Sequence, residues 1–285
     1  MSDCWELMKR LREVPPTHRK NLLLIGPPGT GKTYLAGLLA EADGLPFYSV
    51  TTNGRTIPSD LLYAPWLQSD GSAVLQFRPG LRAWGVGDAP GVLVVNEIDE
   101  ASDDALLALG SLLDDPQSAR ITLPDGETVS PAESFRCIAT SNASIRALPE
   151  RLLDRFPIRV LIDTPAPEIL KLLRPDTCAA VTALYASLGW TLDKTGTAAL
   201  FSVREARAYD ALRDALGDEH AARLVWGERA DTIRDQIRLA AQVAISRPRR
   251  TAKSKSSLPG CSTPDARAGG SRRWIPTARR RASIR

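Results

Sequence analysis

The 285-residue sequence is 43% apolar and 25% charged, the composition of a globular protein of about two domains. It has no uncharged apolar run of about 18 residues, which excludes a membrane-spanning helix. Its first residues lack the apolar stretch of a secretory signal, so we expect a cytoplasmic protein. The four cysteines form no C-x-x-C pair and only two histidines are present, which argues against a disulfide framework, a zinc site and a Ser-His-Asp triad.

The basic charge of the chain is concentrated at its C-terminal end. Residues 246–285 hold 12 Lys and Arg against one acid, Asp265, and this leaves residues 1–245 with a net charge of −7. The segment is rich in Ser, Pro, Gly and Arg and has no apolar periodicity, so residues 247–285 are predicted to be a disordered basic tail. Such a tail is either an arm for nucleic acid or an acidic partner, or a solvated extension without a role of its own.

Five short apolar runs predict β-strands. The first, third and fifth are almost continuously apolar, as expected of parallel strands covered by helices on both faces. The runs are Leu22–Gly26, Pro46–Thr51, Val92–Asn96, Phe135–Thr140 and Ile158–Ile162. Helical spacing over Lys32–Asp43 and Ser102–Leu113 predicts helices between them, the second with Ser102 as its N-cap. This alternation predicts an α/β fold with a parallel five-stranded sheet.

Two stretches interrupt the alternation, and the strand signal ends near residue 165. Ile121–Val129 and Trp66–Phe77 contain Asp-Gly turns and are predicted to be hairpins. After Pro165-Ala166-Pro167 the spacing is helical, for example over Ser202–Leu216 and Ala230–Ile245. We therefore predict an α/β core over residues 1–165, a small all-helical domain over 166–246, and the basic tail over 247–285.

One segment has the strongest chemical signal of the sequence. Gly26-Pro27-Pro28-Gly29-Thr30-Gly31-Lys32-Thr33 fits the pattern G-x-x-x-x-G-K-[ST] and lies between a predicted strand and a predicted helix. Its glycines let the backbone N–H groups point at phosphate oxygens, and the helix adds its positive end. Lys32 is predicted to reach the β- and γ-phosphates, and the Thr33 hydroxyl to take a Mg²⁺ position.

Polar side chains follow two other predicted strands. The run Val92–Val95 ends in Asn96 and Glu97, which are predicted to serve on the Mg²⁺ side and to polarise the attacking water. Asn142 ends the run I-A-T-S-N, where its carboxamide could hold both the γ-phosphate and the water.

Two arginines follow in L-P-E-R-L-L-D-R-F. Arg151 and Arg155 are four residues apart, which predicts that they share one face of a short helix. In a ring, Arg155 could reach a neighbouring subunit's γ-phosphate; the simpler interpretation is a surface pair with Asp154.

Together these motifs resemble those of AAA+ ATPases, and specifically of the MoxR family, often found with von Willebrand factor A-type partner proteins. The similarity covers about Asn21 to Ala241 and is carried by G-P-P-G-T-G-K-T, N-E-I-D-E-A-S, L-P-D-G-E-T-V, A-T-S-N, L-L-D-R-F and F-S-V-R-E-A. It implies a P-loop NTPase core with a helical lid, ATP and Mg²⁺ as cofactors, and a ring-shaped homo-oligomer with six subunits as the expected number.

The resemblance also implies residue roles. Asn142 matches the first sensor, Arg155 the arginine supplied to a neighbouring subunit, and Arg204 the second sensor. Both predicted hairpins match segments that face the pore or a client in related rings. The family usually has Asp at the position of Asn96; Asn brings no negative charge, so we expect weaker Mg²⁺ binding.

The function expected from these features is ATP-driven remodelling or activation of a partner protein, including metal or cofactor insertion or complex assembly. A DNA-associated AAA+ motor, with the tail as an electrostatic arm, is the alternative. Against it, residues 1–245 are acidic and have no aromatic-rich basic groove. A small-molecule P-loop kinase is a third class. The absence of an [NT]-K-x-D segment argues against guanine specificity.

Overall fold

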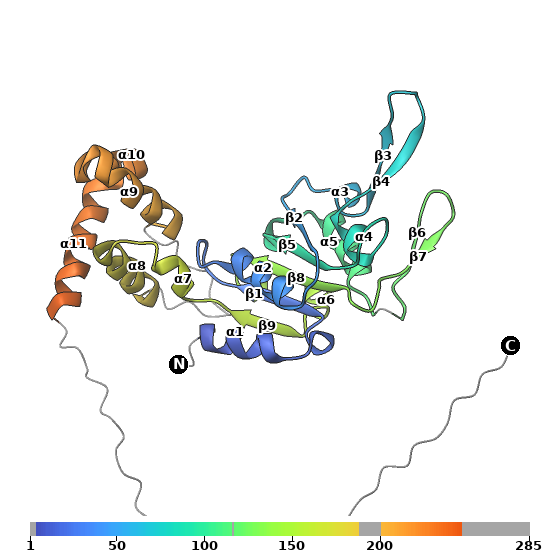
Figure 1. Ribbon diagram of the computed structural model, residues 1–285, viewed down its shortest axis with the longest axis horizontal. Helices are drawn as coiled ribbons and strands as arrows, with labels where there is room; N and C mark the ends of the chain where they lie inside the picture. Colours follow the sequence, from blue (N-terminus) through green and yellow to red (C-terminus); the bar gives the residue numbers. More distant parts are fainter. Residues whose placement is uncertain (1–3, 116, 188–200, 247–285) are drawn as a thin grey trace, which may run out of the picture. The chain divides into compact units, whose positions relative to one another are not determined.

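A computed structural model describes residues 4–115, 117–187 and 201–246 of the chain (Figure 1). The predicted basic tail over 247–285 lies outside these residues, so its prediction of disorder is not tested. No helix among the described residues is long and apolar enough to cross a bilayer.

Five strands form one fully parallel sheet in the order β2-β5-β8-β1-β9, which confirms the predicted fold class. The strands are β1 Asn21–Ile25, β2 Phe47–Thr51, β5 Val92–Asn96, β8 Arg136–Ser141 and β9 Ile158–Leu161. Each lies within two residues of its predicted bounds. The order places the carboxyl ends of β5, β8 and β1 next to one another, and parallel sheets bind ligands at that edge.

Both faces of the inner strands β1 and β5 are covered, which explains their continuous apolar runs. Leu23 and Ile25 of β1 belong to the core with α4 (Pro79–Trp84) and α5 (Asp103–Leu112). Leu22 and Leu24 belong to the opposite core, with α1 (Cys4–Glu13) and α2 (Lys32–Ala42). Successive side chains of a strand point to opposite faces, so a doubly covered strand is apolar at most of its positions.

Both predicted hairpins are present, and Figure 1 shows each extending away from the α/β core. β3 (Tyr63–Leu67) pairs with β4 (Ala73–Phe77) between the short helix α3 (Pro58–Leu61) and α4. β6 (Ile121–Thr122) pairs with β7 (Thr128–Val129) before β8.

After β9 the described residues are helical, as predicted. The helices are α7 Pro167–Leu170, α8 Pro175–Ser187, α9 Val203–Leu216, α10 Asp218–Trp226 and α11 Ala230–Ser246. They have an apolar core of their own, with Phe201, Tyr209 and Trp226 among its buried rings. Residues 188–200 lie outside the described part, and the boundaries at 165 and 246 stay predictions.

The prediction that Arg151 and Arg155 share one face of a short helix is wrong. The helix α6 covers only Glu150–Leu153, so Arg155 lies two residues beyond its end. The reason is Pro157, because a proline disfavours helical backbone at the residue before it, here Phe156.

Gly26, directly after β1, lies close to the backbone of Ile162, directly after β9. A Cβ atom at Gly26 would lie 2.0 Å from the backbone oxygen of Ile162, whereas one at Gly37, inside α2, would meet nothing within 4 Å. We expect Gly26→Ala to lower the free energy of unfolding by about 3 kcal/mol or more, because backbone must move.

The matched control is Gly37→Ala, which should be neutral or stabilising by about 0.5–1 kcal/mol, since Ala is the better helix former. Urea unfolding of both variants measures the difference. Equal stability of the two variants would contradict the close packing at Gly26.

Candidate nucleotide-binding site

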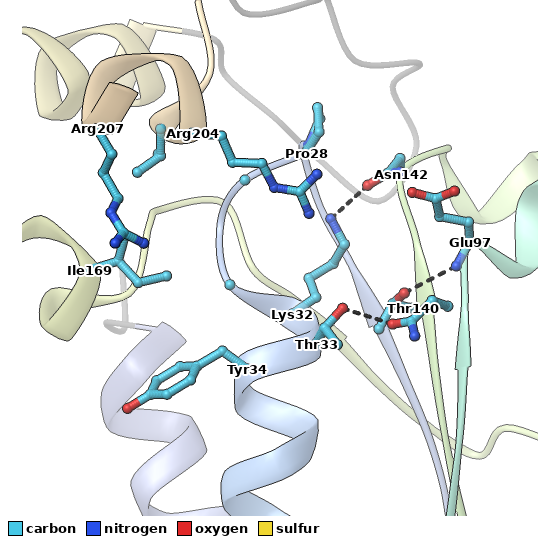
Figure 2. Close-up of a pocket in the computed structure, with 14 residues that line it drawn as sticks. Pro28, Lys32, Thr33, Tyr34, Glu97, Thr140, Asn142, Ile169, Arg204 and Arg207 are labelled. Carbon is cyan, nitrogen blue, oxygen red and sulfur yellow. Dashed lines mark hydrogen bonds between the residues drawn. The ribbon is translucent and has the colours of Figure 1, made fainter. Parts of the chain in front are cut away.

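The loop between β1 and α2 forms one wall of a pocket (Figure 2). Gly29 and Gly31 have φ of 81° and 98°, values that favour glycine, so the sequence pattern is required by the loop's backbone. The Thr30 hydroxyl donates to the carbonyl oxygen of Pro27 at 3.0 Å and closes the loop on itself. The loop is therefore built as the G-x-x-x-x-G-K-T motif predicts.

The start of α2 points its N–H groups at this loop. Gly31 is the N-cap of the helix, and no side chain caps it. The first turn of a helix has N–H groups without partners inside the helix, and these carry partial positive charge. An uncapped helix start beside a glycine-rich loop is suited to bind an anion such as phosphate.

Lys32 is the buried cation of the site. Its ammonium group donates to the carbonyl oxygens of Gly26 and Pro27 and to Oδ1 of Asn142, each at 2.8 Å. Burial lowers the pKa of Lys32 from 10.5 to about 8; the negative charges of Asp99 and Glu97 oppose this change, and Arg204 adds to it. Three oxygen acceptors thus hold the ammonium group beside the phosphate loop. Phosphate oxygens of a bound ligand would replace them as acceptors.

Thr33 and Asn96, the two residues predicted to lie at a Mg²⁺ position, line the pocket and are hydrogen-bonded to each other. The Thr33 hydroxyl donates to Oδ1 of Asn96 at 2.7 Å, and Nδ2 of Asn96 donates to the Ser49 hydroxyl at 3.0 Å. The second bond requires the amide nitrogen, so it turns the carboxamide oxygen toward Thr33. Two neutral oxygens thus face each other beside the phosphate loop.

The backbone of Glu97 is in the left-handed conformation, which is strained for a residue other than glycine. Its φ of 58° is the one positive value at a non-glycine residue in the described chain. Its N–H donates to the Thr140 hydroxyl at 3.2 Å, and its carbonyl oxygen accepts from the Thr52 hydroxyl at 2.8 Å. Strained residues of this kind occur at functional sites, where the surrounding structure holds them. Here the turn places the exposed carboxylate on the pocket wall near Asn142 (Figure 2).

Two arginines from α9 line the same pocket. Arg204 and Arg207 are one turn apart, and Figure 2 shows the Arg204 guanidinium directed toward Lys32 and Arg207 beside Ile169. Ser202 caps this helix, since its hydroxyl accepts from the Glu205 N–H while the Glu205 carboxylate accepts from the Ser202 N–H. The Tyr185 hydroxyl of α8 donates to the carbonyl oxygen of Pro28 at 2.8 Å and joins the helical part to the loop.

The structure brings most of the predicted site residues into one pocket. The sequence residues that line it are Pro28, Gly29, Gly31, Lys32, Thr33, Asn96, Glu97, Asn142 and Arg204. Arg155 lies elsewhere: its half-exposed guanidinium forms an ion pair with Asp114 at 2.8 Å, and not with the sequence neighbour Asp154. The structure of one chain thus keeps Arg155 apart from its own pocket.

Sequence reasoning missed several residues here. Tyr34, Ile169 and Arg207 line the pocket without a motif of their own, although Arg207 follows Arg204 at helical spacing. Asp99 accepts hydrogen bonds from the backbone N–H groups of Asn142 and Ala143 beside the pocket. Its position two residues after Glu97 is the sequence feature that could have indicated it.

The donors for a metal ion are oxygen atoms. No cluster of three or more His, Cys, Asp or Glu side chains suited to a metal occurs in the described part of the chain. Thr33 and Asn96 do offer a hydroxyl and a carbonyl oxygen at the phosphate loop. Mg²⁺ prefers oxygen ligands and often takes only one or two from the protein, with substrate phosphates and water completing its shell, so the residues fit this ion.

Comparison with known proteins places this geometry in a family. Residues 21–156 match the AAA domain (dynein-related subfamily). An uncharacterized protein of Staphylococcus saprophyticus is 34% identical over 145 residues, 48% of this chain and 53% of that protein. The denitrification regulatory protein NirQ of Pseudomonas aeruginosa is 31% identical over 46% of this chain and 48% of its own. Protein MoxR of Paracoccus denitrificans is 28% identical over 55% of this chain and 45% of its own.

Residues 21–156 are therefore an AAA+ ATPase domain, the class that the phosphate loop and the parallel sheet define. Within this class the domain is of the MoxR type, which confirms the resemblance found in the sequence. The chain spans about half the length of these curated relatives.

Burial of Lys32 gives a prediction for stability against pH without nucleotide or metal. The unfolded chain keeps its proton up to pH 10.5, whereas the folded chain releases it near pH 8. Between these values the unfolded state binds more protons, so stability rises with pH. Relative to Lys32→Met, the unfolding free energy of the wild-type protein should gain about 3 kcal/mol between pH 7 and 10.5.

Urea unfolding at several pH values in a chelator-containing buffer measures this gain. The Lys32→Met variant is the reference because every other titrating group is common to both proteins. Parallel pH curves for the two proteins would contradict a buried, titrating ammonium.

Proposed function

We propose that this chain binds ATP with Mg²⁺ in the pocket of Figure 2 and hydrolyses the ATP. The observation that carries the proposal is the convergence on Lys32 of the phosphate loop and of Asn142, the latter at 2.8 Å, with Glu97 and Arg204 lining the same pocket. A cation, an uncapped helix start and a carboxylate in one pocket suit a polyanion whose end is attacked by water.

The chain's residues divide the work. N–H groups of the loop and of the first turn of α2 would bind the phosphates, and Lys32 would turn from its carbonyl acceptors to the phosphate oxygens. Thr33 and Asn96 would hold Mg²⁺, which supplies positive charge against the phosphates. Because Asn96 is neutral, its site would hold the ion more weakly than an Asp would.

Glu97 and Asn142 would act on the water. The Glu97 carboxylate is exposed on the pocket wall, where it can orient and polarise a water molecule for attack on the γ-phosphate. Asn142 would hold the γ-phosphate and this water through its carboxamide. Arg204 would contact the γ-phosphate from α9, and this contact ends when the phosphate leaves, so hydrolysis would change how α9 is held.

We further propose that ATP hydrolysis remodels a partner protein in the cytoplasm, within a ring of identical subunits, six being the expected number. Arg155 would complete a neighbour's site, since it lies outside its own pocket and is half-exposed. The β3–β4 hairpin suits contact with a protein client, because Trp66 and Leu67 are 59% and 72% exposed. A partner with a von Willebrand factor A-type domain fits the MoxR resemblance.

In the part of the chain that the structure describes, no comparable surface feature favours the DNA-associated motor. The proposed partner is therefore a protein, and the net charge of −7 over residues 1–245 opposes a nucleic-acid surface on the body.

The first prediction from this function concerns Glu97→Gln. The variant keeps the phosphate-binding groups but loses the carboxylate, so ATP affinity should stay within about threefold while hydrolysis falls about 100-fold or more. ATP binding by calorimetry and phosphate release measure the two effects, and no acceptor is added, which excludes a kinase. Full hydrolysis by Glu97→Gln would remove Glu97 from the mechanism, and stimulation of the wild type by duplex DNA would favour the motor.

A second prediction concerns a site shared between subunits. Arg155→Ala and Glu97→Gln should each be inactive alone, because each ring lacks one part of every site. Mixed rings should recover activity, because a Glu97→Gln subunit can supply its Arg155 to an Arg155→Ala neighbour. Phosphate release at varied mixing ratios measures this recovery.

The matched control for this experiment is Arg151→Ala, which removes an exposed arginine of the adjacent helix. Loss of activity in Arg151→Ala together with full activity in Arg155→Ala would assign the role to Arg151. Failure of the mixture to recover would contradict a shared site.

A further inference from the structure

Asp99 holds the turn that follows β8. Its Oδ1 accepts the backbone N–H of Asn142 at 3.1 Å, and its Oδ2 accepts the backbone N–H of Ala143 at 3.1 Å. A single carboxylate thus holds two consecutive N–H groups. Charge-assisted bonds of this kind are stronger than neutral ones, and two of them fix both the position and the orientation of the turn.

The strained backbone at Glu97 brings Asp99 to this place. After β5, the left-handed conformation of Glu97 turns the chain into the short 3-10 helix Ile98–Glu100, which contains Asp99. The Glu97 N–H donates to the Thr140 hydroxyl at 3.2 Å. Three hydrogen bonds therefore join the carboxyl end of β5 to that of β8, in addition to the pairing of the strands themselves.

These bonds set the distance between the two groups proposed to act on water. Asn142 receives its backbone position from Asp99, and its Oδ1 accepts from the Lys32 ammonium at 2.8 Å. Asn142 lines the pocket, whereas Asp99 is not among the described residues that line it. Asp99 therefore has no direct contact with the pocket; it acts through the groups that it holds and through its charge, which also acts on Lys32.

We propose that Asp99 is a positioning residue for ATP hydrolysis, because its carboxylate holds Asn142 opposite Glu97 through the N–H groups of Asn142 and Ala143. This inference rests on the proposed function. Asp99 makes no contact with substrate in it, and its positioning effect passes through Asn142.

The variant Asp99→Asn tests the inference with little change of shape. Its amide can accept one of the two N–H groups, but its NH₂ group would then face the other N–H, donor against donor. We expect amide hydrogen exchange at Asn142 and Ala143 to become about tenfold faster or more, because an opposed donor is costly. This readout needs neither nucleotide nor activity.

The kinetic test is a double-mutant cycle with Asn142→Ala. Asp99→Asn alone should lower kcat about tenfold or more, with ATP affinity within about threefold. In the Asn142→Ala background, the same substitution should change kcat by less than about twofold, since the carboxamide it would position is gone. A merely structural role for Asp99 would give additive effects.

Asp103→Asn is the matched control, because it removes a nearby exposed acid of α5 that does not contact the turn. It should leave both the exchange and kcat unchanged. Unchanged exchange in Asp99→Asn, unchanged kcat, or additive effects in the cycle would overturn the inference while the proposed function stands. A wild-type protein that binds but never hydrolyses ATP would overturn the proposed function, and this inference with it.

Discussion

The buried ammonium of Lys32 is the interaction on which the site depends. A cation removed from water must find oxygen atoms on every side, and here two carbonyls of its own loop and the Asn142 carboxamide provide them. The same three bonds close the phosphate loop and join it to the end of β8. One charge thus joins the loop to the neighbouring strand.

The parallel sheet makes this arrangement possible. Its strand order places the ends of β5, β8 and β1 side by side, so the loop after β1, Asn96 at the end of β5 and Asn142 after β8 face one space. Every strand between them is covered on both faces, which keeps the edge rigid.

Charge is distributed unevenly over the pocket. Lys32, Arg204 and Arg207 bring three cations to its walls, while Glu97 is the carboxylate among the described residues that line it. At the position proposed to hold a metal ion, Asn96 is neutral, where the MoxR resemblance implies an acid. The pocket is thus suited to a ligand that brings its own negative charge, and the phosphates would supply much of the charge that holds a metal ion.

The sequence by itself determined the sheet, the phosphate loop, both hairpins and the polar strand ends, because each depends on local features: apolar runs, glycines that allow positive φ, and Asp-Gly turns. It did not determine where Arg155 would lie. Pro157 ends the helix before Arg155, and Arg155 forms its ion pair with Asp114, which lies 41 positions earlier in the chain.

Only the tertiary structure decided that Asp99 holds Asn142 and that Arg207 and Tyr34 reach the pocket. Asp99 and Asn142 are 43 positions apart in the chain, and the adjacency of β5 and β8 that brings them together is a property of the folded sheet. Periodicity reports which side of an element is buried, but not which distant element lies against it.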